Sequence, residues 1–260
     1  MNDYVEAVRR ESVRFAAVLA GTELTNPVPS CPDWDVADLI WHLMDVQHFW
    51  ASIVEDLLED PGDVPPFERP APDLLLEGFV KQSARLGKAL ESHQPEEQCW
   101  SWHDDGHSVG WVRRRQAHEA LIHRVDAELA AGISPVLHAD LAADGVDEIF
   151  RYSLDLDNLP DWATYEPDGT TATVALLDGS ASWSMNFGRF LGSSPVSGND
   201  YDLPALKLAR LEGLPDATIR GEPADLDLWL WGRGPLDHLS IDGDQSIAEK
   251  LRRTAADSTT

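Results

Sequence analysis

The stretch "RRRQAHEALIHRVDAE" (residues 113–128) places a glutamate, two histidines and an aspartate within one helical pattern. An α-helix turns by about 100° per residue, so Glu119, His123 and Asp126 fall within an arc of about 60°. The neighbouring face carries the apolar residues, which are Trp111, Ile122, Val125 and Leu129. Because apolar residues mark the side that packs in the core, the sequence predicts that the polar stripe lies on the inward shoulder of this helix.

The other charges of this helix lie on a different side. Arg113, Arg124 and Glu128 fall at about 120–180° from Glu119. We therefore expect these three side chains to be solvated.

The same stretch superficially resembles the zinc-protease motif H-E-x-x-H, but its spacing differs. His118 and His123 are five residues apart and diverge by about 140°, so a regular helix cannot present both to one ion. Glu119 and His123 are four residues apart and can share an ion. A further ligand must then come from another helix.

The predicted helix at residues 35–59 offers two histidines. Its apolar stripe consists of Leu39, Leu43, Val46, Trp50, Ile53 and Leu57. His42 lies on the shoulder of this stripe, whereas His48 lies on the opposite side, which we expect to face solvent. His42 is therefore the favoured ligand, and with Glu119 and His123 it forms a three-ligand site with positions left for water or substrate.

The residues alone also allow a structural interpretation. Glu119 and His123 have the spacing of an ordinary ion pair within a helix, and buried histidines are commonly hydrogen-bonded core residues. Periodicity predicts that the side chains face inward, and it does not distinguish these two uses.

Helical patterns fill the first part of the chain. They cover residues 3–21, 35–59, 73–93 and 109–131, with a fifth at 139–153, and the Pro-rich stretch 25–34 is expected to be a loop. Asp35 and Asp38 have the spacing of a capping box at the start of the second helix. Four main helices with short to medium connections predict a four-helix bundle over residues 1–155.

The pattern changes after about residue 160. "TATVALLDGSASWSMNFG" (171–188) contains two strand-like runs around Asp178-Gly179, which predicts a hairpin. The segments 217–234 and 239–256 each read as strand, turn and helix. The predicted fold class is thus α followed by α+β, with a smaller α+β domain at residues 160–256.

The composition excludes several classes of partner. Asp and Glu total 46 against 20 Lys and Arg, which gives a formal charge of −26. Such a field repels nucleic acid and anionic membranes, so we expect neither as a partner. No apolar run approaches the length of a membrane span, the N-terminus lacks the pattern of a secretory signal, and Cys31 and Cys99 match no zinc spacing. We expect a reduced, cytoplasmic protein.

Three stretches together resemble the mycothiol-dependent maleylpyruvate isomerase family. They are "SCPDWDVADLIWHL" (30–43), "RRRQAHEALIHRVDAE" (113–128) and "EPADLDLWLWGRG" (222–234). The first two resemble the family's DinB-like metal-binding bundle and the third resembles its C-terminal domain, while residues 155–215 are the least familiar. The resemblance places the family's metal ligands on His42, Glu119 and His123, the trio that the helical periodicity selects.

The resemblance implies a divalent ion, typically Zn²⁺, in a pocket that receives a low-molecular-weight thiol. In actinobacteria that thiol is mycothiol. A nearby Zn²⁺ favours the thiolate, which is the nucleophilic form. Addition of the thiolate to an activated double bond, rotation and elimination give cis–trans isomerisation, whereas a reaction that stops at addition or substitution is an S-transfer to a small electrophile.

Two other classes of function remain open at this stage. A site of two histidines and one carboxylate also suits a non-haem iron oxygenase or a hydrolase that uses metal-bound water. The bundle can also be a non-catalytic module that binds a metal or another ligand.

Other residues have supporting roles to test. Asp126 can accept the ring N–H of His123 as a partner behind the ligand, or pair with an arginine at the bundle edge. Arg233 can hold a substrate carboxylate by a forked contact, or act as a cation at a helix C-terminus. Trp34 is expected to pack at the bundle entrance, and nothing near Cys31 in sequence activates its thiol as a nucleophile.

Overall fold

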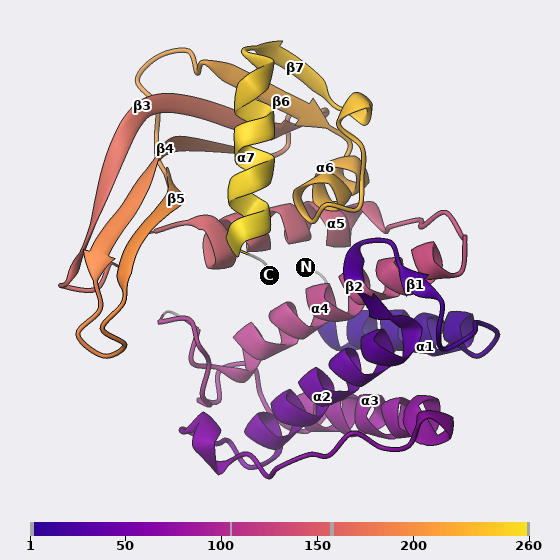
Figure 1. Ribbon diagram of the computed structural model, residues 1–260. Helices are drawn as coiled ribbons and strands as arrows, with labels where there is room; N and C mark the ends of the chain where they lie inside the picture. The colour runs from indigo at the N-terminus through magenta and orange to yellow at the C-terminus, as the bar shows by residue number, and fades with distance from the viewer. Residues whose placement is uncertain (1–2, 105, 157–158, 259–260) are drawn as a thin grey trace. The chain divides into compact units, whose positions relative to one another are not determined.

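Four helices form the core of the N-terminal unit of the protein, Met1–Val136, in the computed structural model (Figure 1). The structure describes residues 3–104, 106–156 and 159–258. The helices are α1 (Tyr4–Leu19), α2 (Val36–Glu55), α3 (Leu75–Ser92) and α4 (Val109–Ala130). The predicted bundle is confirmed, and its core includes the tilted ring pair Phe15 and Phe79, whose centroids lie 4.7 Å apart.

Local capping sets the start of α2, as the sequence predicts, and also the start of α4. The Asp35 carboxylate accepts the backbone N–H of Asp38, and the Asp38 carboxylate accepts the backbone N–H of Asp35. At α4 the Ser108 hydroxyl accepts the N–H of Trp111. These caps satisfy backbone donors that a helix start leaves free, and they fix the residue at which each helix begins.

The loop before α2 contains a short two-stranded sheet that the sequence analysis did not predict. Strand β1 (Pro27–Val28) pairs antiparallel with β2 (Cys31–Asp35). The turn between these strands brings Ser30 close to α4, where it hydrogen-bonds to Asp126. The Pro-rich stretch is therefore an ordered part of the bundle.

The charges of α4 that the sequence placed in solvent are largely buried, so that expectation is wrong. Arg124 is 3% exposed and Glu128 is 4% exposed. The Arg124 guanidinium donates to Glu11 of α1 at 2.8 Å and to Glu128 at 2.6 Å. The reason is that α4 packs against both α1 and α2, so its second side is also covered.

His48 also differs from its expected position in solvent. The segment between α2 and α3, which contains the short 3₁₀ helices Pro61–Asp63 and Pro72–Leu74, covers it. The His48 ring stacks on Phe67 with centroids 4.2 Å apart, and its Nε2 lies 3.1 Å from the carbonyl oxygen of Pro65. His48 is thus held in a structural contact away from the other histidine of α2.

A five-stranded sheet organises the second unit, Leu137–Thr260. Its strands are β3 (Ala163–Leu176), β4 (Ser182–Ser193), β5 (Asp200–Leu208), β6 (Ala217–Gly221) and β7 (Ser240–Gly243), in the order β5-β4-β3-β6-β7. The predicted hairpin is confirmed, and Gly179 in its turn has φ of 74°, a conformation that glycine adopts without steric cost. Strand β5 was not predicted.

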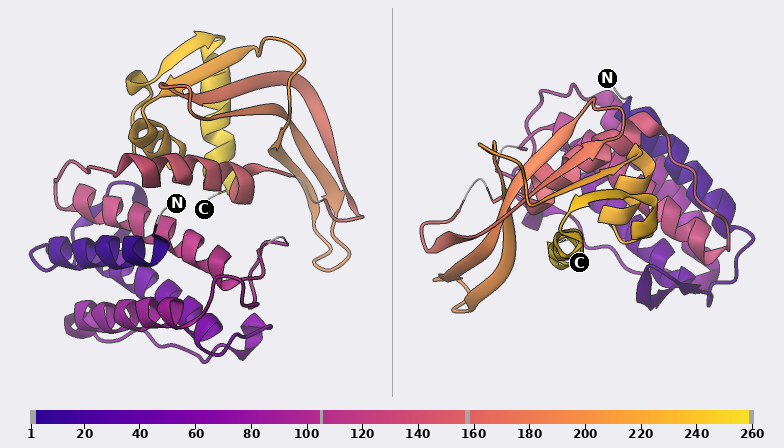
Figure 2. Two further views of the ribbon diagram at one scale, coloured as in Figure 1. Left: turned by 180° about the vertical axis from the view of Figure 1, so that it is seen from behind. Right: turned by 90° about the horizontal axis from the view of Figure 1, so that it is seen from above.

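Three helices accompany the sheet, and α7 lies along it (Figure 2). They are α5 (Ala139–Glu148), which continues into a π-helical turn at Ile149–Leu154, α6 (Pro223–Leu230) and α7 (Gln245–Ser258), with a short 3₁₀ helix at Leu236–His238. The two predicted segments of strand, turn and helix correspond to β6–α6 and β7–α7.

The chain divides between Val136 and Leu137, earlier than the boundary near residue 155 that the helical pattern suggested. The reason is that α5 and its π-helical turn contribute Val146, Ile149, Phe150 and Leu154 to the core under the sheet. Helical periodicity shows that a segment has an apolar face, and it does not show which neighbour covers that face. None of the helices among the described residues is long and apolar enough to cross a membrane.

Candidate metal centre

Helices α2 and α4 bring His42, Glu119 and His123 together. His42 Nε2 lies 3.4 Å from Glu119 Oε1, and His123 Nε2 lies 3.2 Å from the same oxygen. The two imidazole rings meet edge to face, with centroids 4.7 Å apart. One donor atom from each of the three side chains lies within 4.8 Å of the others.

This donor set fits a divalent metal ion. Histidine nitrogen and carboxylate oxygen bind Zn²⁺ at about 2.0–2.2 Å, so neighbouring donors in a tetrahedral site lie about 3.3–3.5 Å apart. The two distances to Glu119 Oε1, 3.4 and 3.2 Å, are close to that separation. Three protein ligands leave a coordination position for water or substrate, as in catalytic zinc sites.

Asp126 lies behind His123, where the sequence predicted a partner for the His123 ring N–H. Its Oδ2 is 3.0 Å from His123 Nδ1, and its side chain is fully buried. A carboxylate at Nδ1 holds the ring N–H there, so the lone pair of Nε2 points toward Glu119 and His42. The contact with Asp126 holds the His123 ring with Nε2 directed toward Glu119.

Ser30 and Arg115 are two site residues that the sequence analysis missed. The Ser30 hydroxyl donates to Asp126 Oδ1 from a loop 96 residues earlier, and no local pattern indicates such a contact. Arg115 Nη2 donates to Glu119 Oε2 at 3.1 Å. The spacing of Arg115 and Glu119, four residues apart on a helix, is a signal that could have indicated this pair.

The two oxygens of Glu119 therefore have different surroundings. Oε2 is held by Arg115, and Oε1 faces the two histidines. Burial alone would raise the pKa of Glu119, but hydrogen bonds from His123 and His42 and the charge of Arg115 hold it well below the usual range. The side chain is a carboxylate at neutral pH, which is the form that binds a cation.

Burial acts on His123 in the opposite direction. It lowers the pKa of His123, but hydrogen bonds to Asp126 and Glu119 outweigh it and raise the pKa to about 9. The two carboxylates thus create a site that favours positive charge at this ring. A divalent ion competes with the proton for Nε2, as it does at any histidine ligand.

Trp34 lies beside the ligands. Its ring centroid is 4.8 Å from that of His42 and 6.3 Å from that of His123. The sequence placed Trp34 at the bundle entrance as a packing residue, and the structure puts its indole directly against the candidate centre. The His42 side chain remains 35% exposed, so the centre can be approached from outside.

The two cysteines lie outside this group. Cys31, on β2, is half-buried, and Cys99 is buried. Burial raises the pKa of Cys99 to about 11, which keeps it as a thiol at neutral pH. The only group of potential ligands that comes together in the described part of the chain consists of His42, Glu119 and His123.

Arg233 belongs to the second unit and follows α6. Its Nη1 donates to the backbone oxygen of Trp231 at 2.5 Å. This contact matches the cation at a helix C-terminus that the sequence allowed. Its other suggested use, as an anchor for a substrate carboxylate, stays a prediction.

Comparison with known proteins identifies both parts of the chain. Residues 5–128 match the family model "Mycothiol maleylpyruvate isomerase N-terminal domain", and residues 140–250 match "MDMPI C-terminal domain". The chain matches none of the curated proteins.

Two solved structures share the fold. They are a mycothiol-dependent maleylpyruvate isomerase and a histidine-to-alanine variant of a mycothiol-dependent maleylpyruvate isomerase, with TM-scores of 0.57 and 0.59. Each is 15% identical in sequence, and each match covers 92% of both chains. Together with the two family models, this shows that the chain belongs to the mycothiol-dependent maleylpyruvate isomerase family.

Proposed function

We propose that this protein is a metal-dependent enzyme that uses mycothiol for cis–trans isomerisation or S-transfer. The observation that carries the proposal is the convergence of His42, Glu119 and His123, with one carboxylate oxygen 3.4 and 3.2 Å from the two ring nitrogens. Membership of the family supports the choice of thiol.

The three ligands would hold a divalent ion, which we take to be Zn²⁺. When bound, such an ion lowers the pKa of a nearby thiol and so favours the nucleophilic thiolate. Neither cysteine of the chain belongs to the donor group. This fits a reaction in which the thiol is supplied by a small molecule.

The remaining residues prepare the centre. Asp126 holds a proton at His123 Nδ1 and leaves Nε2 free as a donor atom. Arg115 fixes the second oxygen of Glu119, which prevents that carboxylate from rotating away. The Trp34 indole covers the two imidazoles on one side and reduces the access of water there.

Isomerisation by this route consumes no reactant other than the substrate, because the thiol is regenerated. A thiolate adds to the activated double bond of a small electrophile, the resulting single bond rotates, and elimination regenerates the thiol with the trans product. If the adduct is not eliminated, the same first step gives S-transfer. A substrate carboxylate would be held by Arg233, whose guanidinium can form a forked contact.

The donor set also favours a second candidate. Two histidines and one carboxylate bind iron in oxygenases and zinc in hydrolases that activate water. Bound metal identity and the need for thiol separate these reactions, because zinc supports no dioxygen chemistry and water-dependent hydrolysis requires no thiol. A protein that holds the ion and catalyses none of these reactions would be a binding module.

The test is elemental analysis of the purified protein, followed by calorimetric titration with mycothiol and an assay of maleylpyruvate isomerisation with and without it. We expect one divalent ion per chain, saturable thiol binding and turnover that requires the thiol. Turnover that is independent of thiol would contradict the proposed mechanism. A failure to isomerise maleylpyruvate, with transfer of the thiol to other electrophiles, would leave S-transfer as the activity.

A further inference from the structure

An open groove lies between α1 and α3 of the N-terminal unit. It has a volume of about 540 Å³, and the fully buried Phe79 lines its floor. Val13 and Val80 line it from exposed positions, with 69% and 50% of their surface accessible. Its other apolar or small lining residues are Ala16, Ala84 and Gly87. Apolar surface of both helices is therefore left in water, and contiguous surface of this kind marks an interaction site.

Most polar side chains of the groove are already engaged. The Arg9 guanidinium pairs with Glu91, with Nη2 2.5 Å from a carboxylate oxygen. The Ser12 hydroxyl accepts a hydrogen bond from the Gln47 amide at 3.0 Å. Among the polar side chains that line the groove, only the Ser83 hydroxyl has no partner in the described part of the chain. A polar small molecule is oriented by several converging polar groups, so the groove is better suited to an apolar protein surface.

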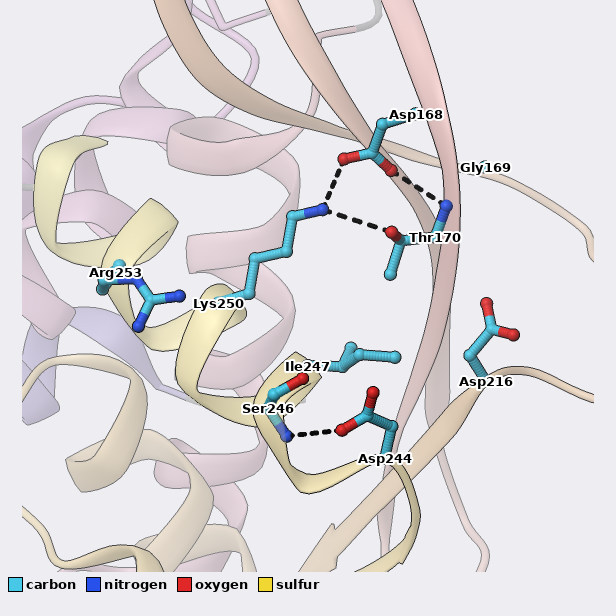
Figure 3. A pocket seen from close by; sticks show the side chains of 9 residues that line it. All are labelled: Asp168, Gly169, Thr170, Asp216, Asp244, Ser246, Ile247, Lys250 and Arg253. Atoms are coloured by element: carbon cyan, nitrogen blue, oxygen red, sulfur yellow. Dashed lines mark hydrogen bonds and ion pairs between the residues drawn. The ribbon is translucent and has the colours of Figure 1, made fainter.

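A larger hollow in the second unit is of a different kind (Figure 3). It has a volume of about 620 Å³, and its walls carry the carboxylates of Asp168, Asp216 and Asp244. Lys250 pairs with Asp168 there and lies 4.9 Å from the centroid of the Phe187 ring. Removing charged walls from water is costly, so this hollow favours water over an apolar protein surface.

The charge of α1 and α3 differs from that of the chain as a whole. These two helices carry six Lys or Arg against four Glu, whereas the chain carries 20 Lys and Arg against 46 Asp and Glu. Exposed charges more than a Debye length apart, about 8 Å at physiological ionic strength, are largely screened, so the local charge of a face decides what approaches it. Two copies of this chain therefore repel each other through their acidic faces but not through this one.

The charges beside the groove are of both signs and are paired on the same face. Lys81 pairs with Glu77 at 2.5 Å toward one end of α3, and Arg9 pairs with Glu91 toward the other end. A face on which the two signs alternate is compatible with a copy of itself. A two-fold contact between identical faces requires this property, because each patch meets the same patch of the other copy.

We infer that the groove between α1 and α3 is the contact surface for a second copy of this chain, in a two-fold dimer. The exposed Val13 and Val80 supply apolar side chains to the contact, and the small residues Ala84 and Gly87 supply the space that receives them. Each copy thus offers both a projecting and a receiving part on one face. The inference concerns assembly, and it depends on neither the metal nor the thiol of the proposed function.

The experiment is sedimentation velocity of the full-length protein at fixed ionic strength, over about 1–200 µM, where weak protein interfaces are partly formed. We expect the mass to rise with concentration from 28.7 kDa to twice that value. Val13→Glu and Val80→Glu each place a carboxylate in the contact twice per dimer, and each should weaken dimerisation about tenfold or more. The control Val196→Glu adds the same charge at a residue of the second unit that is 94% exposed. It should keep the dissociation constant within about twofold of wild type.

Three results would overturn the inference. A wild-type protein that stays at 28.7 kDa over the whole range would show that no second copy binds the groove. Wild-type affinity in Val13→Glu and Val80→Glu would mean that the dimer uses another face. An equal loss in Val196→Glu would mean that total charge controls association. Both groove substitutions are at exposed helical positions and should leave the far-UV circular dichroism unchanged, and if one variant does not fold, the other, on the second helix, decides.

Discussion

His123 uses its two ring nitrogens for different purposes. Nδ1 is 3.0 Å from the buried Asp126 carboxylate, and Nε2 faces Glu119 at 3.2 Å. The ring is only 8% exposed as a side chain, so neither contact can be exchanged freely for water. His123 therefore contacts both Glu119 of the donor group and the buried Asp126.

His123→Ala should abolish stoichiometric metal binding while leaving the helical content unchanged. The reason is that two ligands remain, and a catalytic site contributes less to folding than a structural zinc does. Metal content by elemental analysis and far-UV circular dichroism measure the two effects. His138→Ala, at an exposed position outside the bundle, is the control and should keep the ion. Full metal content in His123→Ala would show that the ligand assignment is wrong.

Asp126→Asn should weaken metal binding without removing a ligand. The amide keeps the size of the side chain, but the charge that stabilises the His123 N–H is lost, and such changes typically cost about 10–100-fold in affinity. Competition with a chelator measures the effect. Ser30→Ala removes only the hydroxyl bound to Asp126 and should have a smaller effect. An affinity for Asp126→Asn within twofold of wild type would limit Asp126 to a packing role.

At the scale of elements, α4 shows what helical periodicity can and cannot predict. The relative directions of Glu119, His123 and Asp126 follow from 100° per residue, and the structure brings the first two together with His42. Periodicity does not say how many neighbours a helix has. Because α1 covers the side opposite the donor group, Arg124 and Glu128 are buried rather than solvated.

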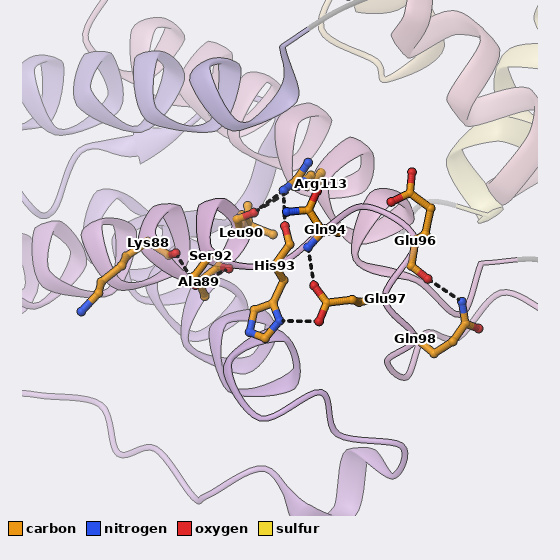
Figure 4. Close-up of polar contacts among 10 residues, drawn as sticks. All are labelled: Lys88, Ala89, Leu90, Ser92, His93, Gln94, Glu96, Glu97, Gln98 and Arg113. Carbon is orange, nitrogen blue, oxygen red and sulfur yellow. Dashed lines mark hydrogen bonds and ion pairs between the residues drawn. The ribbon is translucent and has the colours of Figure 1, made fainter.

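Arg113 illustrates the same limit. Its guanidinium donates to the carbonyl oxygens of Leu90 and His93 at 2.6 Å each (Figure 4). It therefore satisfies carbonyl groups at the C-terminal end of α3, where a helix leaves its last acceptors free. The contact joins positions at least 20 residues apart, and nothing in the local sequence around Arg113 indicates it.

The buried charges between α1 and α4 should matter for stability. In Arg124→Ala the carboxylates of Glu11 and Glu128 lose their shared partner, and breaking a buried pair in this way costs about 3–5 kcal/mol. Denaturant unfolding measures the free energy of unfolding. Arg9→Ala removes an exposed partner of Glu91 and should cost no more than about 1 kcal/mol. Equal effects in the two variants would mean that burial of the Arg124 network is unimportant.

At the scale of the whole molecule, the order of helices and strands was largely readable from the sequence. The four bundle helices and the Asp178-Gly179 hairpin have strong local signals, which are periodicity, caps and turn residues. Strand β5 and the β1–β2 pair are different, because they depend on partners elsewhere in the chain rather than on their own pattern. The same holds for α5, whose apolar face is covered by the sheet of the second unit.

Removal of the ion with a chelator should leave the protein folded. The bundle core is formed by apolar side chains such as Phe15, Leu39 and Phe79, which are not ligands of the ion. An ion present at 100 times its dissociation constant stabilises the folded state by about 2.7 kcal/mol, so the Tm should fall by only a few degrees. Thiol-dependent turnover should be lost and restored by added Zn²⁺. Cooperative unfolding on chelation would indicate a structural ion instead.

X-ray absorption spectroscopy of the purified, metal-loaded protein tests the central claim most directly. The account predicts an ion with two imidazole nitrogens and a carboxylate oxygen at about 2.0–2.2 Å, and no protein sulfur ligand. A sulfur scatterer at about 2.3 Å in the absence of added thiol would place Cys31 or Cys99 at the ion. That result, or a shell without imidazole, would contradict a centre formed by His42, Glu119 and His123.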